Sequence, residues 1–192
     1  FNSGQSCCGI ERIYVDEKIY NNFLELFISK TYNYKLGNPL EKETNLGPVV
    51  KLSAAEFILK QMNSAMDKGA KKMIDENKFI YPKEHKNYLI PQVLTNVNHD
   101  MSFMTEETFG PCVGIMKVRD ENEAIKLMND SPYGLTASIW TKDIEIAEEI
   151  GNKVETGTFY MNRCDYLDPA LSWTGVKETG KGCSLSEVAY EK

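Results

Sequence analysis

Residues 113–129 read VGIMKVRDENEAIKLMN, a short apolar run that passes directly into an amphipathic segment. Residues 113–118, which are apolar apart from Lys117, are typical of a buried strand. Asp120 then occupies a position suited to a helix N-cap, and Ala124, Ile125 and Met128 follow at helical spacing. This stretch therefore predicts a strand that leads into a helix, the unit from which α/β domains are built.

The same alternation of strand and helix continues on both sides of this stretch. A helix after Asp143 runs to Gly151, and a helix capped by Asp16 continues to Gly37-Asn38-Pro39. A further helix opens with a capping box at residues 53–56, flanked by Leu52 and Phe57 as a hydrophobic staple, and ends at Gly69. The expected strands are residues 13–15, 72–74, 88–90, 113–118, 135–140 and 158–161.

Alternating strands and helices predict a three-layer α/β fold with a mainly parallel sheet flanked by helices, because parallel strands need crossover connections. A length of 192 residues and 42% hydrophobic residues suit a single domain over residues 1–192. Residues 162–187 are rich in Gly, Asp, Ser and Thr and predict an irregular stretch that can shape a site.

The composition of the chain argues against several kinds of binding partner. A net charge of −6 argues against nucleic acid, which rewards clustered Lys and Arg. No apolar run approaches the roughly 20 residues that span a bilayer. Five cysteines without Cys-x-x-Cys spacing favour a reducing, cytoplasmic location, unless a targeting signal preceded residue 1, and give no support to a metal site.

The first twelve residues, FNSGQSCCGIER, contain the strongest candidate for chemistry. A Cys7 thiolate is a strong nucleophile, and its small neighbours Ser6 and Gly9 permit close approach of a carbonyl compound. The local sequence alone favours a buried structural thiol, which is the commoner role of a lone cysteine. Cys8 is expected to point elsewhere, as a packing residue or an oxidation partner.

Four segments in order resemble the NAD(P)-dependent aldehyde dehydrogenase superfamily. They are residues 1–12, the TEETFGP segment at 105–111, residues 131–143 with SPYGLTA and WTKD, and residues 157–182 with GVKETGKG. The resemblance implies the cysteine-bearing catalytic domain, essentially the C-terminal part of such an enzyme. It also implies that the cofactor-binding domain and most of the oligomerisation strand lie outside this chain, and that the full-length enzyme is a homo-oligomer.

The resemblance assigns roles to particular residues. Cys7 would attack a small-molecule aldehyde to give a thiohemiacetal, and the thioester left after hydride transfer to NAD or NADP would be hydrolysed to the carboxylic acid. The Cys7 amide would donate to the oxyanion. Glu107 would accept hydrogen bonds from the nicotinamide ribose, and Phe109 would pack beside the nicotinamide.

Other positions carry weaker implications. Tyr166 and Trp173 lie in the region that lines the aldehyde tunnel in the family. Arg163 is a candidate partner for an acidic substrate, or for a local ion pair with Asp165 or Asp168. Roles in the structure rather than in chemistry are expected for Arg12, Asn162 and Lys177.

The sequence lacks a Gly-x-Gly-x-x-Gly loop, the Glu-Leu-Gly-Gly segment that carries the family's general base, and the asparagine that supplies its second oxyanion donor. Losing a general base costs on the order of 100- to 10,000-fold in rate, so we expect the isolated chain to be inactive or nearly so. Two alternatives remain open: a non-enzymatic binding or assembly module, and a weak cysteine-dependent esterase.

Overall fold

A four-stranded sheet organises the first of the two units into which the chain divides, Phe1–Arg119 and Asp120–Lys192. The computed structural model describes residues 1–164 and 166–191. The strands of this sheet are β1 (Arg12–Asp16), β4 (Cys112–Val118), β3 (Gln92–Thr95) and β2 (Lys71–Lys72), in that spatial order. β4 pairs in parallel with both β1 and β3, whereas β2 is antiparallel to β3, so the sheet is mixed but mainly parallel.

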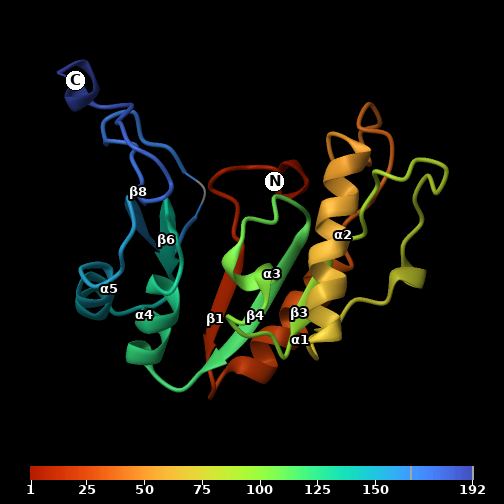
Figure 1. Cartoon of the computed structure of the whole chain (residues 1–192), viewed down its shortest axis with the longest axis horizontal. Helices are drawn as coiled ribbons and strands as arrows, with labels where there is room; N and C mark the ends of the chain where they lie inside the picture. The colour runs from red at the N-terminus through yellow and green to blue at the C-terminus, as the bar shows by residue number, and fades with distance from the viewer. Residues whose placement is uncertain (165, 192) are drawn as a thin grey trace. The chain divides into compact units, whose positions relative to one another are not determined.

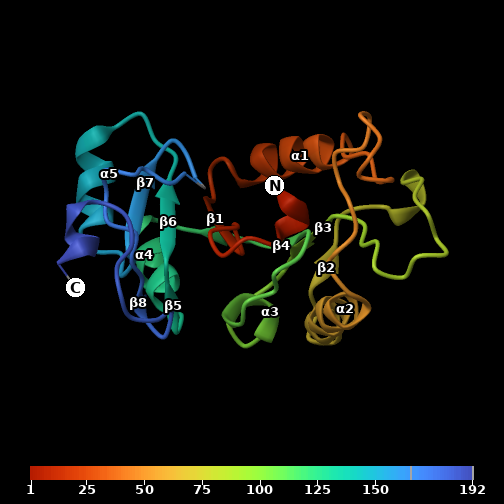
Figure 2. The ribbon, with the colours of Figure 1, turned by 90° about the horizontal axis from the view of Figure 1, so that it is seen from above.

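Helices cover both faces of this sheet. Figure 2 shows α1 (Tyr20–Thr31) on one side of the strands, and α2 (Leu52–Asp67) with the short α3 (Ser102–Thr105) on the other. Figure 1 shows the same elements from the side. The predicted three-layer α/β arrangement is therefore confirmed for this unit.

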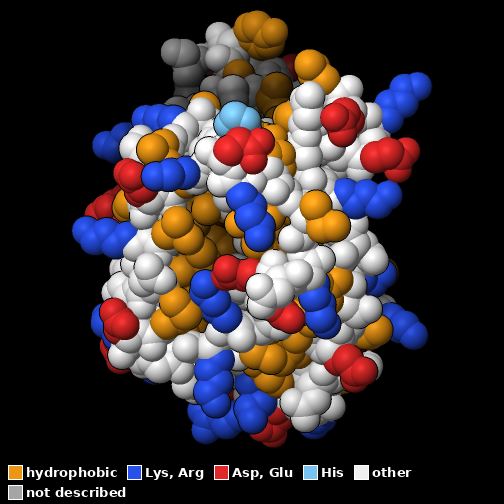
Figure 3. All heavy atoms as spheres, turned by 90° about the vertical axis from the view of Figure 1, so that its right-hand side faces the viewer, with side chains coloured by type: hydrophobic (Ala, Val, Ile, Leu, Met, Phe, Trp, Pro, Cys, Tyr) orange, Lys and Arg blue, Asp and Glu red, His pale blue; other side chains and the backbone are white. Residues whose placement is uncertain are grey.

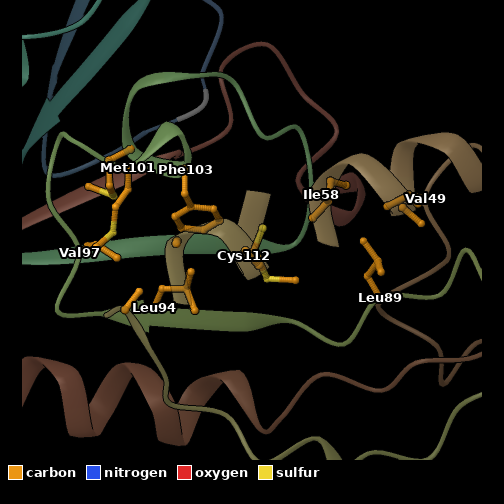
Figure 4. Packing of buried hydrophobic residues seen from close by; sticks show 13 residues of the cluster. Val49, Ile58, Leu89, Leu94, Val97, Met101, Phe103 and Cys112 are labelled. Carbon is orange, nitrogen blue, oxygen red and sulfur yellow. The ribbon is translucent and has the colours of Figure 1, made fainter. Parts of the chain in front are cut away.

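The central strands β3 and β4 are buried on both faces. Val93 and Leu94 are neighbours in β3, yet they belong to two separate hydrophobic clusters, as the two-residue period of a strand requires. One cluster lies under α2 and α3, and Figure 4 shows its packing, with Ile58, Leu94 and Phe103 among the labelled members. The other cluster packs against α1 through partly buried side chains such as Phe23 and Phe27. Burial on both sides explains why β4 is almost wholly apolar in sequence.

The second unit contains two helices and two small sheets. The helices are α4 (Glu121–Asn129) and α5 (Ile144–Gly151). β6 (Thr136–Ile139) pairs in parallel with β7 (Thr158–Met161), and β5 (Tyr133–Gly134) pairs antiparallel with β8 (Val176–Lys177). Three short 3₁₀ helices complete the described elements of the chain, at Asn2–Gly4, Glu76–Lys78 and Glu187–Tyr190.

The helix starts predicted for the second unit are confirmed at atomic level. The Asp120 side chain accepts a hydrogen bond from the Glu123 amide at 2.9 Å, and the Asp143 side chain accepts one from the Ile146 amide at 3.1 Å. In both helices the carboxylate satisfies an amide that has no partner within the helix.

The N-terminal caps predicted for the helices of the first unit are wrong. Asp16 accepts a hydrogen bond from the Lys18 amide instead of capping α1, which begins at Tyr20 and ends at Thr31, well before Gly37. α2 begins at Leu52, which places Ser53 inside the helix with no capping bond. Leu52 and Phe57 are 46% and 50% exposed, so they form no buried staple.

The strand predicted at residues 88–90 is also wrong, because the strand β3 begins after Pro91, at Gln92. Gln92 is 2% exposed, and a buried glutamine conceals a strand from a search for apolar runs. Its side chain accepts from the Ile74 amide at 3.0 Å and donates to the Ile74 carbonyl at 3.2 Å. Both the oxygen and the nitrogen of the buried amide group thus help to join β3 to the segment after β2.

Charged side chains are interspersed on the surface. On the face in Figure 3, Lys and Arg alternate with Asp and Glu, and hydrophobic side chains lie between them. The mixture fits the small net charge of −6. Among the described residues, no helix has both the length and the apolar character that crossing a membrane requires.

Candidate functional site

Cys7 is exposed at the end of a tightly wound peptide that precedes β1. Asn2, Ser3 and Gly4 all have positive φ angles, of 47°, 54° and 77°. The Asn2 side chain donates to the Gln5 carbonyl at 2.8 Å, and the Gln5 side chain donates to the Asn2 carbonyl at 3.1 Å. Left-handed backbone persists only where its surroundings hold it, and these reciprocal bonds supply part of that constraint.

Two side chains fasten this peptide to a segment more than forty residues away. The Ser3 hydroxyl donates to the Gly47 carbonyl at 2.9 Å, and the Gln5 Oε1 accepts from the Val50 amide at 2.7 Å. Ser3 is buried, at 6% exposure. The polypeptide that carries Cys7 is therefore held at a fixed position on residues 47–50.

The cysteines differ sharply in environment. Cys8 is 7% exposed, with its Sγ 3.3 Å from the Ser6 Oγ, so the adjacent thiols point into different surroundings, as predicted. Burial raises the pKa of the Cys112 thiol far above its usual range, with a smaller contribution from the Glu11 charge. A thiol that stays protonated is a poor nucleophile, so we expect Cys112 to react more slowly than the exposed Cys7.

The structure brings the TEETFGP segment directly against the Cys7 peptide. A β-carbon added to Gly4 would lie 2.0 Å from the Gly110 carbonyl oxygen. The Glu11 carboxyl accepts hydrogen bonds from the amides of Thr108 and Phe109, each at 3.1 Å. Arg12 makes a further connection just before this segment, because its Nη1 donates to the Met104 carbonyl at 3.0 Å.

Within that segment, Glu107 and Phe109 are exposed, whereas Thr108 between them is buried at 2%. Phe109 has a φ of 56°, which is rare for a residue with a bulky side chain. The segment therefore presents a carboxylate and an aromatic ring to the outside from a constrained backbone.

Glu11 lies in an unusual electrostatic position. Burial raises its pKa, the amides of Phe109 and Thr108 oppose that shift, and the charge of Glu107 adds to it. The carboxylates of Glu11 and Glu107 thus lie close enough to interact. Sequence reasoning missed Glu11, because a Glu-Arg pair before an apolar strand normally indicates exposed charge.

Residues expected to be structural make structural contacts. The Asn162 side chain donates to the Thr141 carbonyl at 2.8 Å and accepts from the Thr141 amide at 3.0 Å, from a backbone with φ of 56°. The Lys177 ammonium donates to the Asn129 carbonyl at 2.7 Å and lies 2.7 Å from the Glu155 carboxylate.

The predicted tunnel residues lie in the second unit. The Tyr160 hydroxyl donates to the Tyr166 carbonyl, and the Arg163 guanidinium stacks 3.6 Å from the centre of the Tyr166 ring. Trp173 exchanges backbone hydrogen bonds with Ser184, at 2.7 and 2.9 Å. Lining of a substrate path by Tyr166 and Trp173 stays a prediction, and the suggested Arg163–Asp165 pair lies outside the described residues because it involves Asp165.

Among the described residues, no cluster of three or more His, Cys, Asp or Glu side chains is arranged to hold a metal ion. The residues described above offer an accessible thiol, main-chain amides and an exposed carboxylate.

Comparison with known proteins identifies a family for this chain. The family model described as the aldehyde dehydrogenase family matches residues 1–192. The chain is 33% identical over its whole length to 3-sulfolactaldehyde dehydrogenase from Priestia aryabhattai, and 35% identical to an aldehyde dehydrogenase from Emericella nidulans. It also matches the crystal structure of betaine aldehyde dehydrogenase from Staphylococcus aureus in complex with NAD⁺, at 32% identity and a TM-score of 0.92. The chain belongs to the aldehyde dehydrogenase family.

The match covers all of this chain but a smaller share of the relatives. The chain spans 39% of the length of the Priestia enzyme and 38% of the length of both the Emericella enzyme and the S. aureus betaine aldehyde dehydrogenase. One similar structure, of an S. aureus betaine aldehyde dehydrogenase point mutant, contains a cysteine modified by β-mercaptoethanol.

Proposed function

We propose that this chain is the cysteine-bearing catalytic part of an NAD(P)-dependent aldehyde dehydrogenase, with Cys7 as the nucleophile. The observation that carries this proposal is the exposed Cys7 thiol on a fastened peptide, packed against the segment that presents Glu107 and Phe109. Family membership supports oxidation of an aldehyde as the reaction.

The first step follows from the chemistry of a thiolate. The Cys7 sulfur adds to the aldehyde carbon, a C–S bond forms, and the carbonyl π electrons move to oxygen, which gives a thiohemiacetal. A main-chain amide at Cys7 can donate to that oxygen, and a fixed dipole stabilises developing charge without reorganisation. After oxidation to the thioester, attack by water breaks the C–S bond, releases the carboxylic acid and restores the thiol.

Residues of this chain suit a nicotinamide cofactor. The exposed Glu107 carboxylate offers two acceptor oxygens, which match the donor hydroxyls of a ribose, and the 38%-exposed Phe109 offers an aromatic face for a planar ring. Bound NAD⁺ or NADP⁺ supplies the acceptor for the hydride that leaves the substrate carbon. Glu107 and Phe109 would orient it, and their constrained backbone limits the freedom lost on binding.

The isolated chain is proposed to turn over slowly or not at all. Hydrolysis of the thioester needs a base to activate water, and the sequence has no Glu-Leu-Gly-Gly segment. Loss of that base alone predicts a deficit on the order of 100- to 10,000-fold. The cysteine content suits a reducing, cytoplasmic setting, and the complete enzyme is expected to be a homo-oligomer that acts on a small aldehyde.

The test is formation of NAD(P)H from a panel of aldehydes, followed by absorbance. The 192-residue chain is compared with the complete enzyme, in which the chain is joined to a cofactor-binding domain, and with a Cys7→Ser variant of it. A Cys183→Ser variant is the matched control, because Cys183 lies in the second unit. Robust turnover by the isolated chain would contradict the inactivity, and turnover retained by Cys7→Ser would contradict the assignment of the nucleophile.

A further inference from the structure

Glu11 joins two segments that are almost a hundred residues apart in sequence. Its two carboxyl oxygens accept from consecutive amides, Oε2 from Thr108 and Oε1 from Phe109, at 3.1 Å each. A single side chain thus fixes the direction of two successive N–H groups. Pairs of successive main-chain N–H groups are well suited to hold an anionic oxygen pair, and charge-assisted bonds of this kind are stronger than neutral ones.

Glu11 bonds to a stretch of backbone that has an unfavourable conformation. Phe109 has a φ of 56°, in the left-handed region that an aromatic residue rarely adopts. Relaxation of this residue to negative φ would turn its amide away from Glu11 and move its side chain. The bond from the Phe109 amide to Glu11 therefore opposes that relaxation directly.

Glu11 is also coupled to the neighbouring carboxylate. The negative charge of Glu107 adds to the effect of burial in raising the pKa of Glu11. Glu107 and Phe109 flank Thr108, whose amide is the second donor to Glu11. Both residues assigned to the cofactor under the proposed function are thus adjacent to an amide that Glu11 fixes.

From this geometry we infer that Glu11 is a positioning residue, which holds the Thr108–Phe109 backbone so that Glu107 and Phe109 are presented to the nicotinamide cofactor. Glu11 acts through the main chain and makes no contact with the cofactor itself. The inference rests on the proposed function only in its identification of Glu107 and Phe109 as the cofactor contacts.

Glu11→Gln is the sharpest substitution, because it preserves shape. The glutamine oxygen can accept from one amide, but its NH₂ group then faces the other amide, and two donors cannot bond. Glu11→Asp keeps both acceptor oxygens on a shorter stem. Glu106→Gln is the matched control, since Glu106 is an exposed carboxylate of the same segment.

Two measurements test the inference without relying on turnover. In the 192-residue chain, hydrogen exchange of the Thr108 and Phe109 amides should accelerate about tenfold or more in Glu11→Gln, the factor expected for loss of one hydrogen bond. In the complete enzyme, the Kd for NAD⁺ measured by calorimetry should rise about fivefold or more. Glu11→Asp should recover part of both effects, and Glu106→Gln should change neither. Should Glu11→Gln fail to fold, Glu11→Asp is measured instead, with a smaller change of the same sign expected.

The results of these measurements distinguish failure of the Glu11 inference from failure of the proposed function. Unchanged amide exchange would overturn the inference, and so would faster exchange with an unchanged NAD⁺ affinity, because Glu11 would then be only a local brace. Failure of the proposed function would appear differently, as turnover that survives Cys7→Ser while the two effects of Glu11→Gln persist. An enzyme that binds no NAD⁺ would overturn both.

Discussion

Gly4 and Gly110 touch backbone to backbone: a β-carbon on Gly4 would lie 2.0 Å from the Gly110 carbonyl oxygen and 2.4 Å from its carbonyl carbon. This contact joins the peptide that carries Cys7 to the segment that carries Glu107 and Phe109. The backbone atoms of Gly4 and Gly110 cannot move aside as the end of a flexible side chain could. The closeness of the two segments is therefore built into the backbone as well as into the side-chain bonds of Glu11.

Gly4→Ala tests this contact. Alanine at φ of 77° is strained, and its methyl group would push the two segments apart. We expect a loss of about 3 kcal/mol in the free energy of unfolding by urea. Gly69→Ala is the control: its φ is 102°, but the nearest atom to an added β-carbon is 3.6 Å away, so about 1–2 kcal/mol of strain is expected. Equal losses in the two variants would contradict the contact.

The thiols should separate by reactivity. Cys7 is exposed, whereas Cys112 is buried and its pKa is raised, so Cys112 should remain protonated when the pH is raised from 7 to 9. Iodoacetamide should modify Cys7 at least about tenfold faster than Cys112 throughout that range. Peptide mass spectrometry after timed quenching measures both rates. Equal rates would favour a module without a catalytic thiol.

Helix α2 offers a matched pair of substitutions. Ile58 is 1% exposed and lies where a β-carbon on Gly110 would be only 2.5 Å from its Cδ1, whereas Phe57 is 50% exposed. Ile58→Ala should lower the free energy of unfolding by about 3 kcal/mol. Phe57→Ala should change it by less than about 1 kcal/mol. A large loss of unfolding free energy in Phe57→Ala would contradict the structure and indicate that Phe57 does pack in a hydrophobic staple.

Glu11 should leave a signature in the pH dependence of stability. Because burial raises its pKa, the folded chain holds a proton that the unfolded chain releases, and stability must fall as pH rises through that interval. The free energy of unfolding of the unsubstituted chain, relative to Glu11→Gln, should therefore decrease as pH increases from about 4.5. Urea titrations at several pH values measure this difference. A difference that grows with pH would contradict the raised pKa.

Much of the fold follows from patterns that act locally. The helices capped by Asp120 and Asp143 are predicted correctly, because each cap joins a donor and an acceptor three residues apart. The strand at β7 is also predicted correctly. The capping box of α2 and the strand β3 are predicted incorrectly. Ser53 fits a capping box, but the chain enters α2 at Leu52, and Gln92 hides β3 because its amide is satisfied by Ile74, eighteen residues away.

The site residues also fall into those that could be identified from the sequence and one that only the structure reveals. Cys7, Glu107 and Phe109 are identified through family resemblance, which carries information that no local pattern holds. Neither local sequence patterns nor the family resemblance identifies Glu11, because its role depends on two amides that lie close to it only in the folded chain. Long-range contacts between polar groups are what the sequence conceals.

The most direct test of Cys7 as the nucleophile is the mass of the Cys7 peptide after the complete enzyme has been mixed with aldehyde and NAD(P)⁺ and rapidly quenched. An acyl group should appear on Cys7, persist in Cys8→Ser, and vanish in Cys7→Ser along with a loss of at least about 1,000-fold in turnover. An acyl group on another residue, or a Cys7→Ser enzyme that still oxidises aldehyde, would contradict the account.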